Sequence, residues 1–206
     1  MSDKNKGSQL SASPALIDFI TEDHIKKTML SVSDVISKLY GTENVINGKS
    51  YKFVPDFQEN FLSALLHDDF SHALTQVLID DTNVDCEAPR NHTIYDLTMP
   101  GYSWQPEVKV AKYNGKDVSK IKWLTSSQKS GYYFLIAADT NVERFYVAYG
   151  FIDGDKFERA GRFATLDLES AHSCNLRTFI GKITKSKKQN KNIYSCYLDP
   201  VRIGKK

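Results

Sequence analysis

The stretch that decides the fold runs from Thr93 to Tyr113. It reads Thr93-Ile-Tyr-Asp-Leu-Thr-Met99, then Pro100-Gly101 and, after five further residues, Glu107-Val-Lys-Val-Ala-Lys-Tyr113. Both runs are rich in β-branched and aromatic residues, which favour strands, and proline followed by glycine favours a turn between them. The stretch therefore predicts a β-hairpin.

Further strands are expected on the C-terminal side of this hairpin. Residues 132–138 are apolar on both faces and predict a central strand, and residues 144–152 predict another beside it. Between the hairpin and these strands, Asn114-Gly115 indicates a turn, and residues 117–131 predict a helix that begins at an aspartate cap and ends at glycine. The last strands are expected to flank the lysine-rich segment 185–191.

Helices are expected on the N-terminal side. Ser13-Pro14 is typical of a helix start, and Ser33 predicts the cap of a second short helix that ends near Tyr40. Apolar residues at helical spacing predict further helices over 56–66 and 71–79. Residues 1–12 are too polar to pack and predict a flexible tail.

The predicted class is therefore α/β (α+β), with a central mixed β-sheet flanked by helices and a helical region at the N-terminus. A single domain is expected over residues 13–206, because 206 residues bury one substantial core. Within it we expect a helical region at 13–50, a core at 56–150, and C-terminal strands with a basic loop at 151–206.

The composition is that of a soluble protein. No run approaches the roughly 18 apolar residues of a membrane span, and the N-terminus lacks the apolar segment of a signal peptide, so no membrane association and a cytoplasmic location are expected. Cys86, Cys174 and Cys196 lack CxxC spacing, which argues against a disulfide framework. His172 with Cys174 would give zinc only two ligands, fewer than a zinc site needs.

The net charge of +2 hides an asymmetry between the two halves of the chain. Residues 1–100 carry 8 Lys/Arg against 15 Asp/Glu, which gives −7, whereas residues 101–206 carry 19 against 10, which gives +9. An excess of this kind suits a polyanionic partner, although it also occurs on ordinary solvated surfaces.

Three charged residues of the predicted hairpin, Asp96, Glu107 and Lys109, are candidates for one site. In a strand Glu107 and Lys109 point to one side, while Val108 points to the other. A two-residue loop at Gly101-Tyr102 would place residues whose numbers sum to 203 opposite one another, and Asp96 with Glu107 is such a pair. A loop with an odd residue count would separate the two carboxylates onto opposite faces.

Two facing carboxylates are unfavourable unless a cation neutralises them, and Mg²⁺ held by Asp96 and Glu107 would do so. Such an ion polarises a scissile phosphate and activates water, and Lys109 would position that water and balance developing charge. The pattern therefore predicts phosphodiester hydrolysis. One alternative is a plain surface ion pair between Lys109 and Glu107. Asp85 and Glu87 are rivals for the first carboxylate.

These residues resemble the PD-(D/E)xK nuclease superfamily, whose core is an Asp-bearing strand, a (D/E)xK strand, a helix and a further strand. The resemblance covers about residues 56–150 and implies a restriction-endonuclease-like core and a Mg²⁺-dependent deoxyribonuclease. The short chain, its N-terminal helical region and the compact spacing between Asp96 and Glu107 look most like a type II restriction endonuclease, part of a restriction-modification system.

The sequence departs from the superfamily pattern in one respect, because Tyr95 and not proline precedes Asp96. The dipeptide Pro55-Asp56 matches the name, but it lies far before Glu107 at an expected helix start. Glu59 is a possible accessory acid, which helix capping explains more simply.

Double-stranded DNA is the expected partner, and the basic second half supplies the expected contacts. Phosphate or base contacts are predicted for Lys112, Lys116, Lys156, Arg159, Arg162, Lys185, Lys187, Lys188 and Lys191. A palindromic target would favour a homodimer, with the apolar N-terminal helices as its interface. The alternatives are a structure-selective repair or junction-resolving nuclease, and a non-catalytic nucleic-acid-binding protein.

Overall fold

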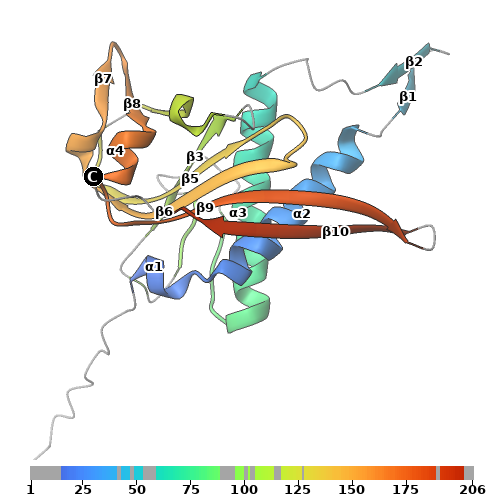
Figure 1. The fold of residues 1–206 in the computed structure, drawn as a ribbon, viewed down its shortest axis with the longest axis horizontal. Helices are drawn as coiled ribbons and strands as arrows, with labels where there is room; N and C mark the ends of the chain where they lie inside the picture. Colours follow the sequence, from blue (N-terminus) through green and yellow to red (C-terminus); the bar gives the residue numbers. More distant parts are fainter. Residues whose placement is uncertain are drawn as a thin grey trace, which may run out of the picture.

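The protein is a mixed α+β structure with a five-stranded sheet between two layers, as the sequence predicts (Figure 1). The computed structural model describes residues 15–40, 43–46, 49–52, 59–88, 96–99, 102, 105–113, 117–126, 128–188 and 191–201.

The five-stranded sheet has the order β10-β9-β6-β5-β3. Its strands are β3 (Glu107–Lys112), β5 (Gly131–Ala138), β6 (Arg144–Ile152), β9 (Leu176–Lys188) and β10 (Lys191–Pro200). β3 is parallel to β5, and all other neighbours are antiparallel. The central strands β5 and β6 are almost wholly buried, which confirms the two strands expected from their apolar sequences.

One face of this sheet is covered by helices. These are α1 (Leu16–Phe19), α2 (Glu22–Tyr40) and α3 (Glu59–Thr82), of which α2 packs by β10 and α3 by β3. Their apolar residues are buried against the sheet. The N-terminal apolar stripe predicted as a dimer interface belongs to this core, because Leu16, Ile20, Ile25 and Met29 are 0% exposed. That interface prediction is wrong.

Each of the two long helices continues through a serine at which the sequence predicts a new helix to begin. Ser33 lies inside α2, because the stripe of Met29, Val32 and Ile36 passes it without a break. Ser71 lies inside α3, where its hydroxyl donates to the carbonyl oxygen of His67 at 2.9 Å. A serine that bonds back to the preceding turn, as Ser71 does, is compatible with a helix interior. Neither serine starts a helix.

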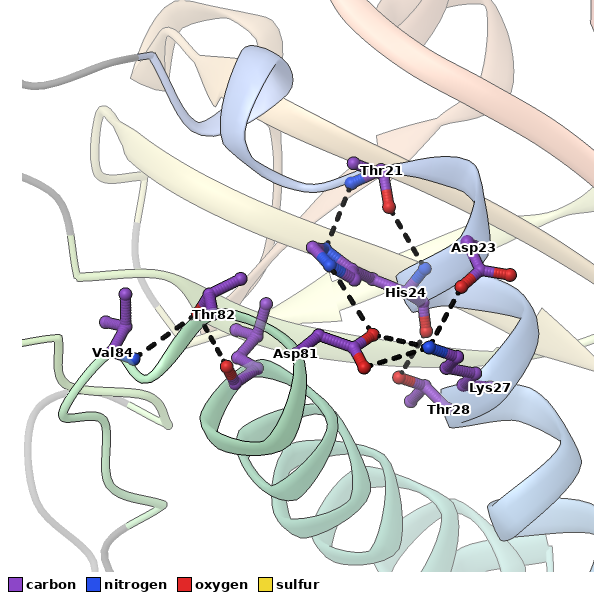
Figure 2. A network of polar contacts seen from close by, with 9 residues as sticks. Thr21, Asp23, His24, Lys27, Thr28, Asp81, Thr82 and Val84 are labelled. Atoms are coloured by element: carbon purple, nitrogen blue, oxygen red, sulfur yellow. Dashed lines mark hydrogen bonds and ion pairs between the residues drawn. The ribbon is translucent and has the colours of Figure 1, made fainter.

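A polar cluster joins the first turn of α2 to the last turn of α3 (Figure 2). Lys27 Nζ lies 2.6 and 2.9 Å from the two carboxylate oxygens of Asp81 and 3.0 Å from Asp23. The side chain of Thr21 accepts from the backbone N–H of His24, whose ring nitrogen accepts from Thr21 N–H in return. This reciprocal cap fixes the start of α2 beside α3.

The opposite face carries a smaller layer of mixed structure. It contains β4 (Lys122–Thr125), β7 (Glu158–Ala160), β8 (Phe163–Asp167), α4 (Leu168–His172), and the 3-10 turns η2 (Val118–Lys120) and η3 (Gly154–Lys156). The strands pair in the order β4-β8-β7. The buried Trp123 anchors the layer by donating from Nε1 to the Ile136 carbonyl oxygen at 2.9 Å.

Two predictions for the connecting segments are wrong. The helix expected over 117–131 is only the short turn η2, capped by Asp117, and β4 follows because Trp123 and Thr125 alternate with exposed residues. The expected helical region 13–50 also contains a strand, since β1 (Glu43–Ile46) pairs antiparallel with β2 (Lys49–Lys52). The predicted tail 1–12 and the dipeptides Ser13-Pro14, Asn114-Gly115 and Pro55-Asp56 lie outside the described residues.

Candidate active site

Strand β3 holds two of the three predicted site residues at the edge of the large sheet. Val108 is 0% exposed and points into the helical core, so Glu107 and Lys109 point to the other face. Their side chains are 18% and 21% exposed, and Lys109 Nζ lies 2.9 Å from Glu107 Oε2. This half-buried ion pair is accessible to a ligand from solvent.

Asp96 lies against the same triplet. Its Oδ2 accepts a hydrogen bond from the backbone N–H of Val108 at 2.6 Å. The neighbouring Leu97 donates its N–H to the carbonyl oxygen of Pro106 at 3.3 Å. The structure therefore brings Asp96 to the backbone of the residue between Glu107 and Lys109.

Only part of the predicted hairpin can be compared with the structure, because residues 93–95, 100–101 and 103–104 lie outside the described residues. In the described part, residues 96–99 form no strand with β3. The Leu97–Pro106 contact has the expected register, since the two numbers sum to 203, but Pro106 has no N–H to return the bond. The next ladder donor on β3, Val108 N–H, is taken by the Asp96 carboxylate. Thr98 pairs with Glu87 in an isolated bridge.

His67, on α3, is a site residue that the sequence analysis missed. Its Nε2 lies 3.2 Å from Asp96 Oδ1, and its Nδ1 lies 2.9 Å from Asp68 Oδ1. The hydrogen bond to Asp96 raises the pKa of His67 above its usual value, although burial acts in the opposite direction. No local pattern in the sequence points to His67, because the contact joins a helix to a distant segment.

The Asp96 carboxyl is held in its ionised form. Burial acts to raise its pKa, but the hydrogen bonds from His67 and Val108 and the positive charge of Lys109 outweigh burial and lower the pKa. Asp96 is therefore within electrostatic reach of Lys109. An anionic Asp96 beside a Glu107–Lys109 pair is what the sequence-based site requires.

Asp96 and Glu107 are the residues that could hold a metal ion here. In the described part of the chain, no group of three or more His, Cys, Asp or Glu side chains is placed to bind one. A pair of carboxylates still fits a hard divalent ion such as Mg²⁺, which takes few protein oxygens and keeps several waters. Asp96 already accepts one protein donor on each oxygen, and each oxygen retains a second lone pair.

The other acids that the sequence offers as site residues lie at the two ends of α3. Asp85 and Glu87 are exposed residues that follow α3. Glu59 is the first residue of α3, and its side chain lies outside the described part of the structure.

Tyr133, which pairs with Glu107 in register, donates from its hydroxyl to the Lys129 carbonyl oxygen at 2.8 Å. Burial and the charge of Glu107 raise the pKa of Tyr133 to about 12.

The predicted DNA-contacting residues fall into separate groups. Lys112 is exposed at the end of β3, and Lys116 lies outside the described residues. Lys156, Arg159 and Arg162 belong to η3, β7 and the turn before β8. Lys185, Lys187, Lys188 and Lys191 lie on β9 and β10, so most of the expected lysine loop is strand. In Figure 1 the β7–β8 hairpin rises at the left of the molecule, whereas β9 and β10 extend together to its right end, so the two groups lie far apart.

The other metal candidate from the sequence is engaged in packing. His172 Nε2 lies 2.9 Å from the hydroxyl oxygen of Tyr146, and burial lowers the pKa of His172. Cys86, Cys174 and Cys196 are all free thiols. Among the described helices, none has the length and apolar character needed to cross a membrane.

Comparisons with protein-family models, with curated proteins and with solved structures find no match for this chain.

Proposed function

We propose that Asp96, Glu107 and Lys109 form a metal-dependent phosphodiesterase site and that the protein is a DNA endonuclease. The observation that carries the proposal is the 2.6 Å bond from Val108 N–H to Asp96, which brings a second carboxylate to the Glu107-Val108-Lys109 triplet. A plain surface ion pair would not need an ionised aspartate beside it.

Each side chain of the proposed site has its own role. Asp96 and Glu107 would hold Mg²⁺, which when bound polarises a phosphate oxygen and lowers the pKa of bound water. His67 and Val108 N–H orient Asp96 and keep it ionised. Lys109 is placed by Glu107 so that its ammonium balances negative charge that develops on the phosphate.

The pairing of β3 with β5 agrees with one part of the resemblance to the PD-(D/E)xK nucleases, in which a further strand follows the (D/E)xK strand. Two elements differ from that pattern in this chain. The Asp96 segment forms no strand with β3 in the described residues, and η2 with β4 replaces the connecting helix. The proposal therefore depends on the site residues more than on the fold.

The proposal is tested by digesting long DNA with the purified protein in Mg²⁺ and, separately, in EDTA. We expect cleavage only with the metal, and its loss in Glu107→Gln and Lys109→Ala. Glu143→Gln is the matched control, since Glu143 is an exposed glutamate in the turn before β6. Absence of cleavage with every divalent ion tried would refute the proposal.

A sequence-specific, type II restriction activity is the form of the function that we propose. It predicts discrete fragments from a plasmid, whereas cleavage only of branched or damaged DNA would indicate the structure-selective alternative. A homodimer acting on duplex DNA in the cytoplasm belongs to the same proposal. Its interface has to lie away from the buried apolar stripe of α1 and α2. Sedimentation of the free and DNA-bound protein tests the dimer.

A further inference from the structure

A small cleft lies beside Glu107, at the end of the sheet where the parallel strands β3 and β5 begin. It has a volume of about 90 Å³, and Gln105, Glu107, Lys129 and Tyr132 contribute to its walls. Pockets for whole small molecules usually measure roughly 300 Å³ or more. The cleft therefore suits one group of a larger substrate and not a free nucleotide.

Lys129 gives this cleft a positive charge. Its side chain is exposed, and its ammonium has no ion-pair partner among the described residues. Lys109, by contrast, is already paired with Glu107. Glu107 and Lys129 are the charged residues that line the cleft. Because Lys109 already offsets the charge of Glu107, the charge of Lys129 is left to attract an anionic group.

The backbone that carries Lys129 is held in place. The hydroxyl of Tyr133 donates to the Lys129 carbonyl oxygen at 2.8 Å, and the N–H of Gly154 donates to Ser130 Oγ at 2.9 Å. Gly154 also passes so close that an added Cβ would lie 2.7 Å from the Gln128 carbonyl oxygen. Two hydrogen bonds and this close approach therefore hold the segment before β5, so Lys129 extends from a fixed backbone.

We infer that this cleft binds a backbone phosphate of the nucleic-acid substrate, next to the phosphate that is cleaved, with Lys129 as its cationic ligand. The inference rests on the proposed function, because it takes Glu107 as part of the cleavage site. A phosphate contact of this kind positions one strand along β3 and β5 and carries no sequence preference.

Binding of fluorescently labelled duplex DNA in EDTA, measured by anisotropy between 50 and 200 mM salt, tests the inference without cleavage. Lys129→Ala is expected to reduce the slope of log K against log salt by about 0.9, the value for one phosphate contact on duplex DNA. Affinity at low salt should fall about fivefold, equally for unrelated sequences. Lys129→Arg should keep the wild-type slope, since it keeps the charge.

Lys38→Ala is the matched control, because it removes a lysine of α2 that is 74% exposed and paired with Asp34. It should change neither slope nor affinity. A wild-type protein that binds and cleaves DNA while Lys129→Ala keeps the full salt slope would overturn the phosphate site and leave the nuclease proposal intact. A wild-type protein that neither binds nor cleaves any DNA would overturn both.

Discussion

Two histidine–aspartate pairs join α3 to another described segment, and they differ in what else contacts the carboxylate. At the end of α3, His24 Nε2 lies 3.8 Å from Asp81, which Lys27 engages on both oxygens. Nearer its start, His67 lies 3.2 Å from Asp96, whose charged neighbour Lys109 is instead paired with Glu107. A lysine therefore engages both oxygens of the first carboxylate, whereas in the described residues the second accepts only from His67 and from the backbone N–H of Val108.

The protonation of the two histidines differs accordingly. Burial dominates at His24 and lowers its pKa, with Asp81 acting only partly against it. The hydrogen bond to Asp96 dominates at His67 and raises its pKa. A histidine–aspartate contact alone therefore does not mark a functional site. The other groups around the carboxylate distinguish Asp81, which joins two helices, from Asp96, which we propose as part of a site.

The largest expected effect is on Asp96 itself. Asp96→Asn keeps the size of the side chain but removes the negative charge that a divalent ion requires, so cleavage should fall by roughly 10²–10³-fold or more. Gel assays of plasmid DNA under Mg²⁺ measure the change, with Glu143→Gln as the control. Wild-type activity in Asp96→Asn would exclude Asp96 and point to the rival acids Asp85 and Glu87.

A smaller effect is expected for the two histidines, and it should separate them. His67→Ala removes a partner that orients a proposed metal ligand, a change that typically costs about 10–100-fold in activity. His24→Ala should leave cleavage by the folded protein unchanged. It should instead lower the unfolding free energy by about 1–2 kcal/mol, because the Thr21 N–H loses its acceptor.

Cleavage rates together with thermal melting test this contrast, since 1–2 kcal/mol corresponds to a fall in Tm of about 2–8 °C for a chain of this size. If His67→Ala melts early and still cleaves at the wild-type rate, then His67 is a structural residue like His24 and the two regions do not differ in function.

Some strands of the fold could be predicted from the sequence and others could not, for identifiable reasons. Strands β5 and β6 could be found because apolar residues on both faces leave no other arrangement. The β1–β2 hairpin was missed although Asn47-Gly48 is a strong hairpin signal. Strand β4 was missed because Ile121 and Leu124 have helical spacing, while burial of Trp123 decides the structure.

The site, too, could be predicted only in part from the sequence. The register of Leu97 with Pro106 followed from counting residues, but the missing N–H of Pro106 ends the ladder and lets Asp96 bond to Val108 instead. The nearness of Asp96 to the Glu107 triplet was therefore predicted for a partly wrong reason. The contact of His67 depends on where α3 packs, which tertiary structure alone determines.

The smallest expected effect is a pH dependence of stability at His24. Its folded pKa lies below the ordinary value of 6.5, so the unfolded chain binds a proton more readily. This contribution to stability is fully present above pH 6.5 and is lost as the pH falls towards the folded pKa. Asp81, Asp23 and Lys27 face the ring, and the two carboxylates reduce the effect while the lysine increases it.

Urea unfolding of the wild type and of His24→Gln between pH 7.5 and 5 measures the contribution of His24 to the free energy of unfolding, because glutamine does not titrate. The difference in unfolding free energy between the two proteins should narrow as the pH falls, in favour of the variant. A difference that stays constant over this range would mean that His24 titrates alike in both states. Its burial beside Asp81 would then have no effect on its charge, and the electrostatic contrast between the two histidines would not hold.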